Sequence, residues 1–188
     1  KYIEKALTQV VDDGLKYRSK IHKRDDIWYD KNHCIIEKEF LSFFKESQPE
    51  TYKKIYSRYG ESTAKKLISR FDSEINNKGL IHVLRKGFND VYGGNIKLIY
   101  FKSNSLLNIK YRKEKYLKNR FLLVRQLHYS PNSNKSIDIA IFINGIPIIT
   151  IELKNQLTGQ NIDDSDHQYK FDRDPRGDPL LKFQRCIC

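Results

Sequence analysis

Residues 137–155 read Ile-Asp-Ile-Ala-Ile-Phe-Ile-Asn-Gly-Ile-Pro-Ile-Ile-Thr-Ile-Glu-Leu-Lys-Asn, a run that is almost entirely apolar and β-prone. Asn144-Gly145 divides it, and this dipeptide is the strongest short-range signal for a β-hairpin. Three charged side chains, Asp138, Glu152 and Lys154, interrupt the apolar residues. Strands this rich in isoleucine are typical of sheets buried on both faces, where unmatched charges are costly. The three charges therefore need an explanation other than packing.

The register of the hairpin decides whether these charges meet. Glu152 and Lys154 are two residues apart on a strand, so both point to one face. A strict two-residue loop at the Asn-Gly pair sets Asp138 opposite Ile151 and turns it away from Glu152. One more residue in the turn, or a bulge, sets Asp138 directly opposite Glu152. Pro147 cannot donate a ladder hydrogen bond and favours such a bulge. The sequence thus predicts an irregular hairpin.

Two carboxylates on one face repel each other unless positive charge lies between them. Mg²⁺ prefers oxygen ligands and binds through one or two carboxylates together with water and phosphate oxygens. The pattern predicts Mg²⁺ bound by Asp138 and Glu152, with the backbone carbonyl of Leu153 as a third ligand. Lys154 would hold the attacking water or stabilise the charge of the transition state. The alternative is an ion pair of Lys154 with either carboxylate at an exposed sheet edge, where lysine deters aggregation.

The length of the chain indicates the number of domains, and its net charge indicates the class of partner. The 188 residues suit one ordinary domain with a real core. The net charge of +12 comes from 35 basic and 23 acidic residues, which favours a polyanionic partner. A soluble protein that merely happens to be basic is the alternative. No apolar run approaches the roughly 20 residues that span a bilayer, and no signal segment opens the chain.

The cysteines indicate the redox environment of the protein, and the lack of methionine bears on whether the sequence is a fragment. Cys34, Cys186 and Cys188 form neither a disulfide framework nor a zinc site, so we expect reduced thiols in a cytoplasmic protein. The chain contains no methionine and ends on Cys-Ile-Cys, and we expect it to be a fragment of a longer protein.

The order of the expected elements predicts an α/β domain with a mixed central sheet flanked by helices. Residues 1–78 form a mainly helical part, with a first helix over 3–11, an irregular stretch over 16–34, and three helices over 35–77 divided at Pro49 and Gly60. Residues 79–188 form the sheet-containing core of the same domain. Its expected strands are 80–84, 96–101, 121–129, the hairpin and a start at 180–187, with a solvated basic loop at 110–118 and a weak helix over 156–172.

The same hairpin resembles the PD-(D/E)xK nuclease motif. More narrowly, it resembles the N-terminal endonuclease domain of the R (HsdR) subunit of type I restriction-modification enzymes. The resemblance covers residues 79–188 well and the helical start loosely. It is carried by residues 136–147, 151–155, 158–160, 168–169, 173–175 and 179–183, and upstream by 79–80, 84–88, 119–121 and 125–130.

The resemblance implies a restriction-endonuclease-like core with Asp138, Glu152 and Lys154 as catalytic residues and Mg²⁺ as cofactor. It also implies that Gln168 begins a Gln-xxx-Tyr element that helps to orient the active site. Position 172 is aspartate and not tyrosine, so Tyr169, next to Gln168, is the candidate replacement. Related nucleases place an acidic residue of the first helix near the metal. Glu4 is the candidate here, and a solvated helix face is its alternative.

The resemblance also implies partners. The full-length subunit would continue into helicase-like motor domains that bind ATP and translocate DNA, and it would assemble with methyltransferase and specificity subunits in a bacterial or archaeal cytoplasm. This chain has no phosphate-binding loop, so ATP would be a cofactor of the full-length subunit only. Double-stranded DNA would be contacted through its backbone, with Lys113, Lys115, Arg173 and Arg176 as candidates. The alternatives are a repair or recombination nuclease of the same superfamily, and a DNA-binding or assembly domain that does not cut.

Overall fold

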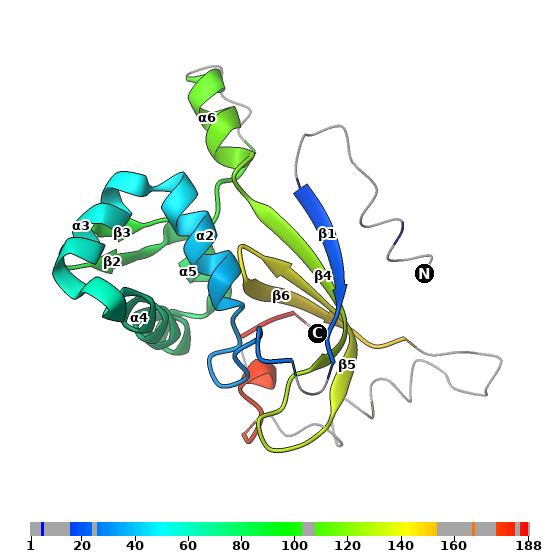
Figure 1. Ribbon diagram of the computed structural model, residues 1–188. Coiled ribbons are helices and arrows are strands. Elements are labelled where there is room, and N and C mark those ends of the chain that lie inside the picture. The colour runs from blue at the N-terminus through cyan, green and yellow to red at the C-terminus, as the bar shows by residue number, and fades with distance from the viewer. Residues whose placement is uncertain are drawn as a thin grey trace.

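The computed structural model describes residue 5 and residues 16–23, 26–102, 108–153, 167, 176–182 and 185–187. A four-stranded mixed sheet lies beside a layer of helices (Figure 1). The sheet has the order β1-β4-β5-β6, with β1 parallel to β4 and the other neighbours antiparallel. Its strands are β1 (Lys16–Ile21), β4 (Arg120–His128), β5 (Ser136–Ile143) and β6 (Ile146–Ile151). The predicted α/β fold with a mixed, helix-flanked sheet is confirmed.

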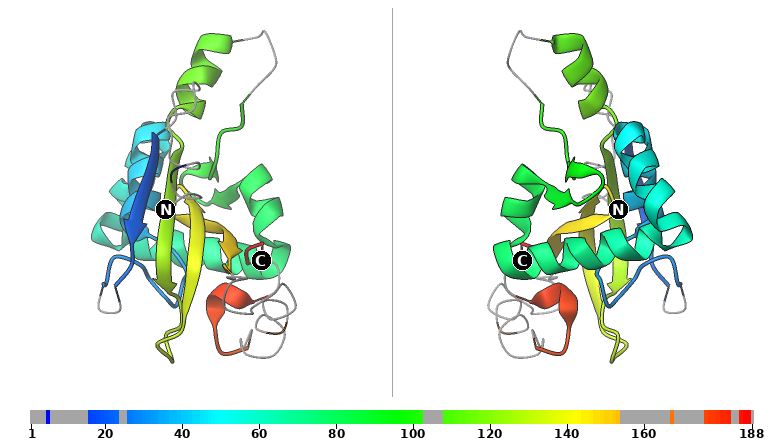
Figure 2. Two further views of the ribbon diagram at one scale, coloured as in Figure 1. Left: turned by 90° about the vertical axis from the view of Figure 1, so that its right-hand side faces the viewer. Right: turned by 90° about the vertical axis from the view of Figure 1, so that its left-hand side faces the viewer.

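Pro49 and Gly60 divide the helices as predicted. Pro49 occupies the first turn of a helix, where its missing N–H costs nothing, and Gly60 ends that helix with a φ of 54°. Figure 2 shows the helices gathered on one side of the sheet. They are α2 (Glu37–Ser47), α3 (Pro49–Tyr59), the 3-10 turn η1 (Gly60–Ser62), α4 (Thr63–Lys78) and α5 (Leu80–Lys86).

Four local predictions were wrong. The expected strand at 80–84 is helix α5, in which Leu80 and Val83 are buried at helical spacing while Ile81 and His82 are exposed. The expected strand at 96–101 reduces to β3 (Gly94–Ile96), which pairs with β2 (Phe88–Asp90) in a separate small sheet. The irregular stretch contains β1, a polar edge strand with no apolar alternation to reveal it. The basic loop contains helix α6 (Ile109–Tyr116).

Apolar side chains form two cores. The helical core packs the inner faces of α2–α5 against the small sheet and Ile146, and includes Phe40, Phe44, Ile55, Leu67, Phe71 and Val83. The sheet core packs one face of the main sheet against the segment before α2 and against Leu180, and includes Tyr29, Ile36, Leu122, Val124, Leu127, Ile137, Ala140 and Phe142. The two cores meet where α2 begins, because Ile35 belongs to one and Ile36 to the other.

The Asn-Gly turn locks the hairpin against α2. Asn144 and Gly145 have φ values of 51° and 80°, the positive values that a type I′ turn requires. The buried Asn144 side chain donates to the carbonyl of Leu98 (2.8 Å) and accepts from the amide of Arg120 (2.8 Å). The Gly145 carbonyl accepts a 2.8 Å hydrogen bond from Ile36, which fixes the start of α2.

A charge network continues this contact along α2. Glu39 lies 2.5 Å from the guanidinium of Arg18 on β1 and 3.2 Å from that of Arg120 on β4, and Arg120 also pairs with Glu46. Burial of Glu39 raises the pKa of its carboxyl, but the two guanidinium groups outweigh burial and hold that pKa below its ordinary value. Two strands of the sheet are thereby tied to one face of α2.

The C-terminal segment adds only the beginning of a strand. The expected strand at 180–187 is present as a 3-10 turn, η4 (Pro179–Leu181), and as one parallel bridge between Ile149 and Ile187. Arg185 is buried and pairs with Asp72 of α4 at 2.5 Å, which anchors this segment. No helix among the described residues has the length and apolarity to cross a membrane.

The described cysteines, Cys34 and Cys186, are free thiols. Burial raises the pKa of Cys34 to about 11, so it is neutral at physiological pH. The prediction of reduced thiols agrees with this environment.

His22 is a buried histidine held in one neutral form. It follows β1, where Nδ1 accepts the backbone N–H of His128 at 3.1 Å and Nε2 lies 3.2 Å from the carbonyl oxygen of Asp26. These contacts place the single ring proton on Nε2. Burial lowers the pKa of His22 below 6.5, against the opposing effect of Asp26.

Acidification is therefore expected to destabilise the domain through His22. Because the folded-state pKa is lowered, the unfolded chain binds the proton more readily, so this stabilisation is present above about pH 6.5 and is lost as the pH falls from there towards the folded-state pKa. Urea denaturation between about pH 5 and pH 8 should show this loss. His22→Gln should flatten the dependence, whereas His82→Gln on the exposed face of α5 should leave it unchanged. Equal pH profiles for wild type and His22→Gln would contradict the assignment.

Candidate functional site

The hairpin carries the predicted irregularity. Its loop has two residues, but a bulge at Ile148 shifts the register of the strands that follow. The Ile148 side chain packs against the helical core, which accounts for the position of the bulge. The pairs run Ile143 with Ile146, Phe142 with Pro147, Ile141 with Ile149, Ala140 with Thr150 and Ile139 with Ile151. Continuing this register by one pair sets Asp138 opposite Glu152.

Asp138 is half-buried near the start of β5, and hydrogen bonds hold both of its carboxylate oxygens. Oδ2 accepts the backbone N–H of Leu153 at 2.8 Å, and Oδ1 accepts the side-chain amide of Gln126 at 3.1 Å. The Leu153 contact ties the chain just after β6 to Asp138. Glu152, also half-buried, precedes Leu153, so both predicted carboxylates lie at the same end of the sheet.

Gln126 is a site residue that sequence reasoning missed. The register pairs Arg125 with Ile139 and Leu127 with Ile137, which sets Gln126 opposite Asp138. Its amide oxygen accepts a hydrogen bond from the hydroxyl of Ser136 at 3.3 Å. The only hint in the sequence is that Gln126 lies in one of the segments that carry the family resemblance. Nothing in its local pattern marks it as functional.

Several predicted site residues lie outside the described part of the chain: Glu4, Lys154, Gln168, Tyr169 and Arg173. Arg176 is described and lies exposed in a turn. The carbonyl of the next residue, Gly177, accepts a 3.2 Å hydrogen bond from Asn132 in the β4–β5 connection. Arg176 therefore comes to the end of the sheet where β4 stops and β5 begins.

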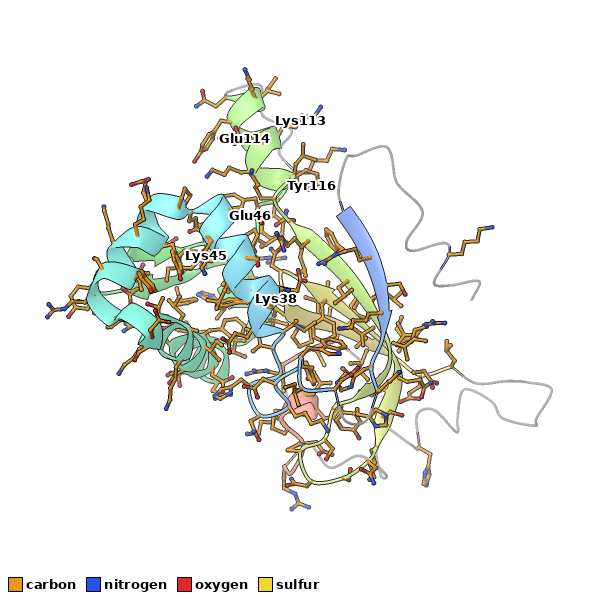
Figure 3. The ribbon with its side chains drawn as sticks, viewed as in Figure 1. Lys38, Lys45, Glu46, Lys113, Glu114 and Tyr116 are labelled. Atoms are coloured by element: carbon orange, nitrogen blue, oxygen red, sulfur yellow. The ribbon has the colours of Figure 1, made fainter. Side chains whose placement is uncertain are left out.

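The two predicted basic residues of the 110–118 run differ in their surroundings. Helix α6 projects beyond both layers (Figure 1) and contains no buried residue. Lys113 is exposed on this arm, where Figure 3 labels it with Glu114 and Tyr116. The ammonium of Lys115 instead donates to the carbonyl of Ser47 at the end of α2 and lies 5.4 Å from the ring centroid of Tyr111. Lys115 thus anchors the arm, and Lys113 faces solvent.

The two carboxylates offer the oxygen ligands that Mg²⁺ prefers. Among the described residues, no group of three or more histidine, cysteine or acidic side chains gathers as a metal site. Mg²⁺ does not need one, because it keeps several waters and takes only one or two carboxylates. A carboxylate oxygen that accepts one hydrogen bond still has a lone pair for a cation. Asp138 and Glu152 therefore fit Mg²⁺.

Comparison with known proteins identifies a family for the chain. A family model described as type I restriction enzyme R protein N terminus matches residues 2–186, which is nearly the whole chain. The search of curated proteins and the search of solved structures gave no match.

Proposed function

Because the chain belongs to the family of type I restriction enzyme R protein N termini, we propose that it is the Mg²⁺-dependent endonuclease module of such a subunit. Its reaction would be hydrolysis of phosphodiester bonds in foreign double-stranded DNA, after ATP-driven translocation by motor domains elsewhere in the subunit. The observation that carries this proposal is the bulge at Ile148, because the register that follows it sets Asp138 opposite Glu152 in a hairpin made almost entirely of apolar residues.

Each residue of the site would have a distinct role. Asp138 and Glu152 would hold the ion, with the Leu153 carbonyl as a further oxygen. When bound, Mg²⁺ would supply positive charge that acidifies water and offsets charge on the phosphate. Lys154 would place its ammonium beside the attacked phosphate and stabilise the negative charge of the transition state. Gln168 would help to orient the site. The backbone N–H of Leu153 donates to the Asp138 carboxylate at 2.8 Å, which keeps that side chain turned towards the end of β6.

Helix α6 would contact the DNA backbone. Gln126 lies six residues beyond Arg120 on β4, which is about 20 Å at the usual rise of a strand. The arm begins beyond that point and extends farther from the site. A helical turn of duplex DNA is about 34 Å long, so a duplex cut at the site could meet the arm roughly one turn away. Arg176 would contact phosphate nearer the site, and Arg173 is proposed for the same role.

The double variant Lys110→Ala/Lys113→Ala tests the arm. The two lysines are exposed one turn apart on α6, so removing them should weaken DNA binding. The negative slope of log affinity against log salt should become less steep, by about 0.9 for each phosphate that the arm no longer neutralises. Filter binding or fluorescence anisotropy over a salt series gives both quantities. Lys65→Ala/Lys66→Ala removes the same charge from the exposed face of α4 and should leave the slope almost unchanged. If both double variants reduced the steepness of the salt dependence equally, the arm would have no special role.

Two alternatives predict different requirements for cutting. A repair or recombination nuclease with the same core would cut without the restriction partners or ATP, and a binding or assembly domain would not cut at all. We expect the assembled restriction enzyme to cut unmethylated DNA only with ATP and Mg²⁺. Removing Mg²⁺ with EDTA should stop cutting, and adding it back should restore it. Both steps are followed on agarose gels.

Cutting by the R subunit alone, without ATP, would favour the repair nuclease. Absence of cutting under every condition, in an enzyme that still hydrolyses ATP on DNA, would favour the binding domain.

A further inference from the structure

Gln126 has an unusual backbone for a residue inside a strand. Its φ is 52°, in the left-handed region that residues other than glycine, asparagine and aspartate rarely enter. Such outliers persist only where the surrounding structure holds them, and they concentrate at functional sites. Gln126 also lies directly opposite Asp138 in the register, so the irregularity coincides with a proposed metal ligand.

On both β4 and β5, the set of residues that faces the sheet core changes at this point. In the sheet core, β4 contributes Leu122 and Val124 before the irregularity and Leu127 after it. On β5, the sheet core takes Ile137 on one side of Asp138 and Ala140 on the other. Even-numbered and odd-numbered residues thus exchange faces on both strands. The exchange leaves Gln126 and Asp138 out of the sheet core while the apolar residues around them remain in it.

A chain of hydrogen bonds fixes how these two side chains face each other. The Ser136 hydroxyl donates to Oε1 of Gln126 at 3.3 Å, which turns Nε2 towards Asp138. Nε2 then donates to Oδ1 at 3.1 Å, while the Leu153 N–H holds Oδ2 at 2.8 Å. Within the described part of the chain each oxygen of Asp138 has one donor, and these two contacts define the plane of the carboxylate. One lone pair on each oxygen remains available to a cation.

We infer that Gln126 is a positioning residue that sets the orientation in which Asp138 binds the metal ion. The inference rests on the proposed function. Gln126 itself does not touch the ion; it acts through the carboxylate, and Ser136 acts through Gln126. Partners of this kind, one step removed from the metal, typically change metal affinity or activity 10–100-fold when they are removed.

Gln126→Gly is the sharpest variant. Glycine adopts a φ of 52° without a Cβ clash, so the strand keeps its path while the amide is removed. In the full-length R subunit without ATP, we expect the dissociation constant for Mn²⁺, followed by its electron paramagnetic resonance signal, to rise about 10–100-fold. The Mg²⁺ concentration for half-maximal cutting by the assembled enzyme should rise by a similar factor. The cutting rate at saturating Mg²⁺ should approach that of wild type. Ser136→Ala should shift both midpoints in the same direction by less.

Asn89→Gly is the matched control, because Asn89 also has a side-chain hydrogen bond across a strand pair, accepted from Asn95 at 3.2 Å, but in the small sheet. It should leave the Mn²⁺ affinity unchanged. Wild-type Mn²⁺ affinity in Gln126→Gly would overturn the inference. So would a cutting rate that falls equally at every Mg²⁺ concentration, which is the sign of a purely structural role.

Asp138→Asn separates this inference from the proposed function. If Asp138→Asn loses Mn²⁺ binding while Gln126→Gly keeps it, only the role of Gln126 fails. If Asp138→Asn binds Mn²⁺ as well as wild type does, the proposed metal site itself fails.

Discussion

Replacing Asp138 by asparagine is expected to abolish DNA cleavage by the assembled restriction enzyme while ATP hydrolysis continues. Asparagine keeps the shape of the side chain and can still accept the 2.8 Å hydrogen bond from Leu153, but it lacks the negative charge that a hard cation requires. Losing several kcal/mol of charge stabilisation corresponds to a fall of ~10³-fold or more in the cutting rate. Plasmid linearisation and phosphate release, measured in the same reaction, give the two activities.

Matched variants make this result specific. Glu152→Gln and Lys154→Ala should give the same separation of cleavage from ATP hydrolysis. Glu50→Gln removes an exposed carboxylate from α3 and should change neither activity. Unimpaired cutting by Asp138→Asn would refute the nuclease proposal. Loss of both activities would instead indicate that Asp138 has a structural or coupling role.

The largest expected effect on stability is that of Gly145→Ala. A Cβ at this position would lie 2.5 Å from the carbonyl oxygen of Ile36 and 2.8 Å from the backbone nitrogen of Phe40. Both are backbone atoms at the start of α2, so neither can rotate away. The φ of 80° adds the strain of a left-handed non-glycine residue. Together these effects should destabilise the domain by about 3 kcal/mol or more, as measured by urea denaturation.

Gly94→Ala is the matched control for the backbone strain alone. Gly94 has a φ of 72°, and nothing lies within 4 Å of its added Cβ. It should cost only about 1 kcal/mol. The difference between the two variants measures how tightly α2 packs on the hairpin turn. Equal costs would mean that α2 moves aside readily and does not hold the strands that carry Asp138 and Glu152.

The hairpin could be predicted because its causes are local. Asn144-Gly145 supplies the two positive φ values of the turn, and Pro147 disfavours a regular ladder next to it. The need for Asp138 to meet Glu152 then required an irregularity, and the structure has one at Ile148. The sequence could not tell which residue would bulge, because the choice depends on how Ile148 packs against the helical core.

The missed features have tertiary causes. β1 is polar and is stabilised by pairing with β4 and by the contact of Arg18 with Glu39, neither of which leaves an alternating pattern. The segment 80–84 is too short for its apolar spacing to distinguish a helix from a strand. In the structure it is helical, because this conformation buries both Leu80 and Val83. Gln126 adopts a conformation that its own residue type disfavours, so only its position opposite Asp138 reveals it.

The central claim is that Asp138 and Glu152 together hold the metal ion at which DNA is cut. Its most direct test is a crystal of the protein grown with Mn²⁺, with anomalous difference density measured at the Mn edge. We expect a peak between the two carboxylates, with an oxygen of each at about 2.0–2.2 Å. An ordered Mn²⁺ bound elsewhere, or no peak between Asp138 and Glu152 at Mn²⁺ concentrations that support cutting, would contradict it.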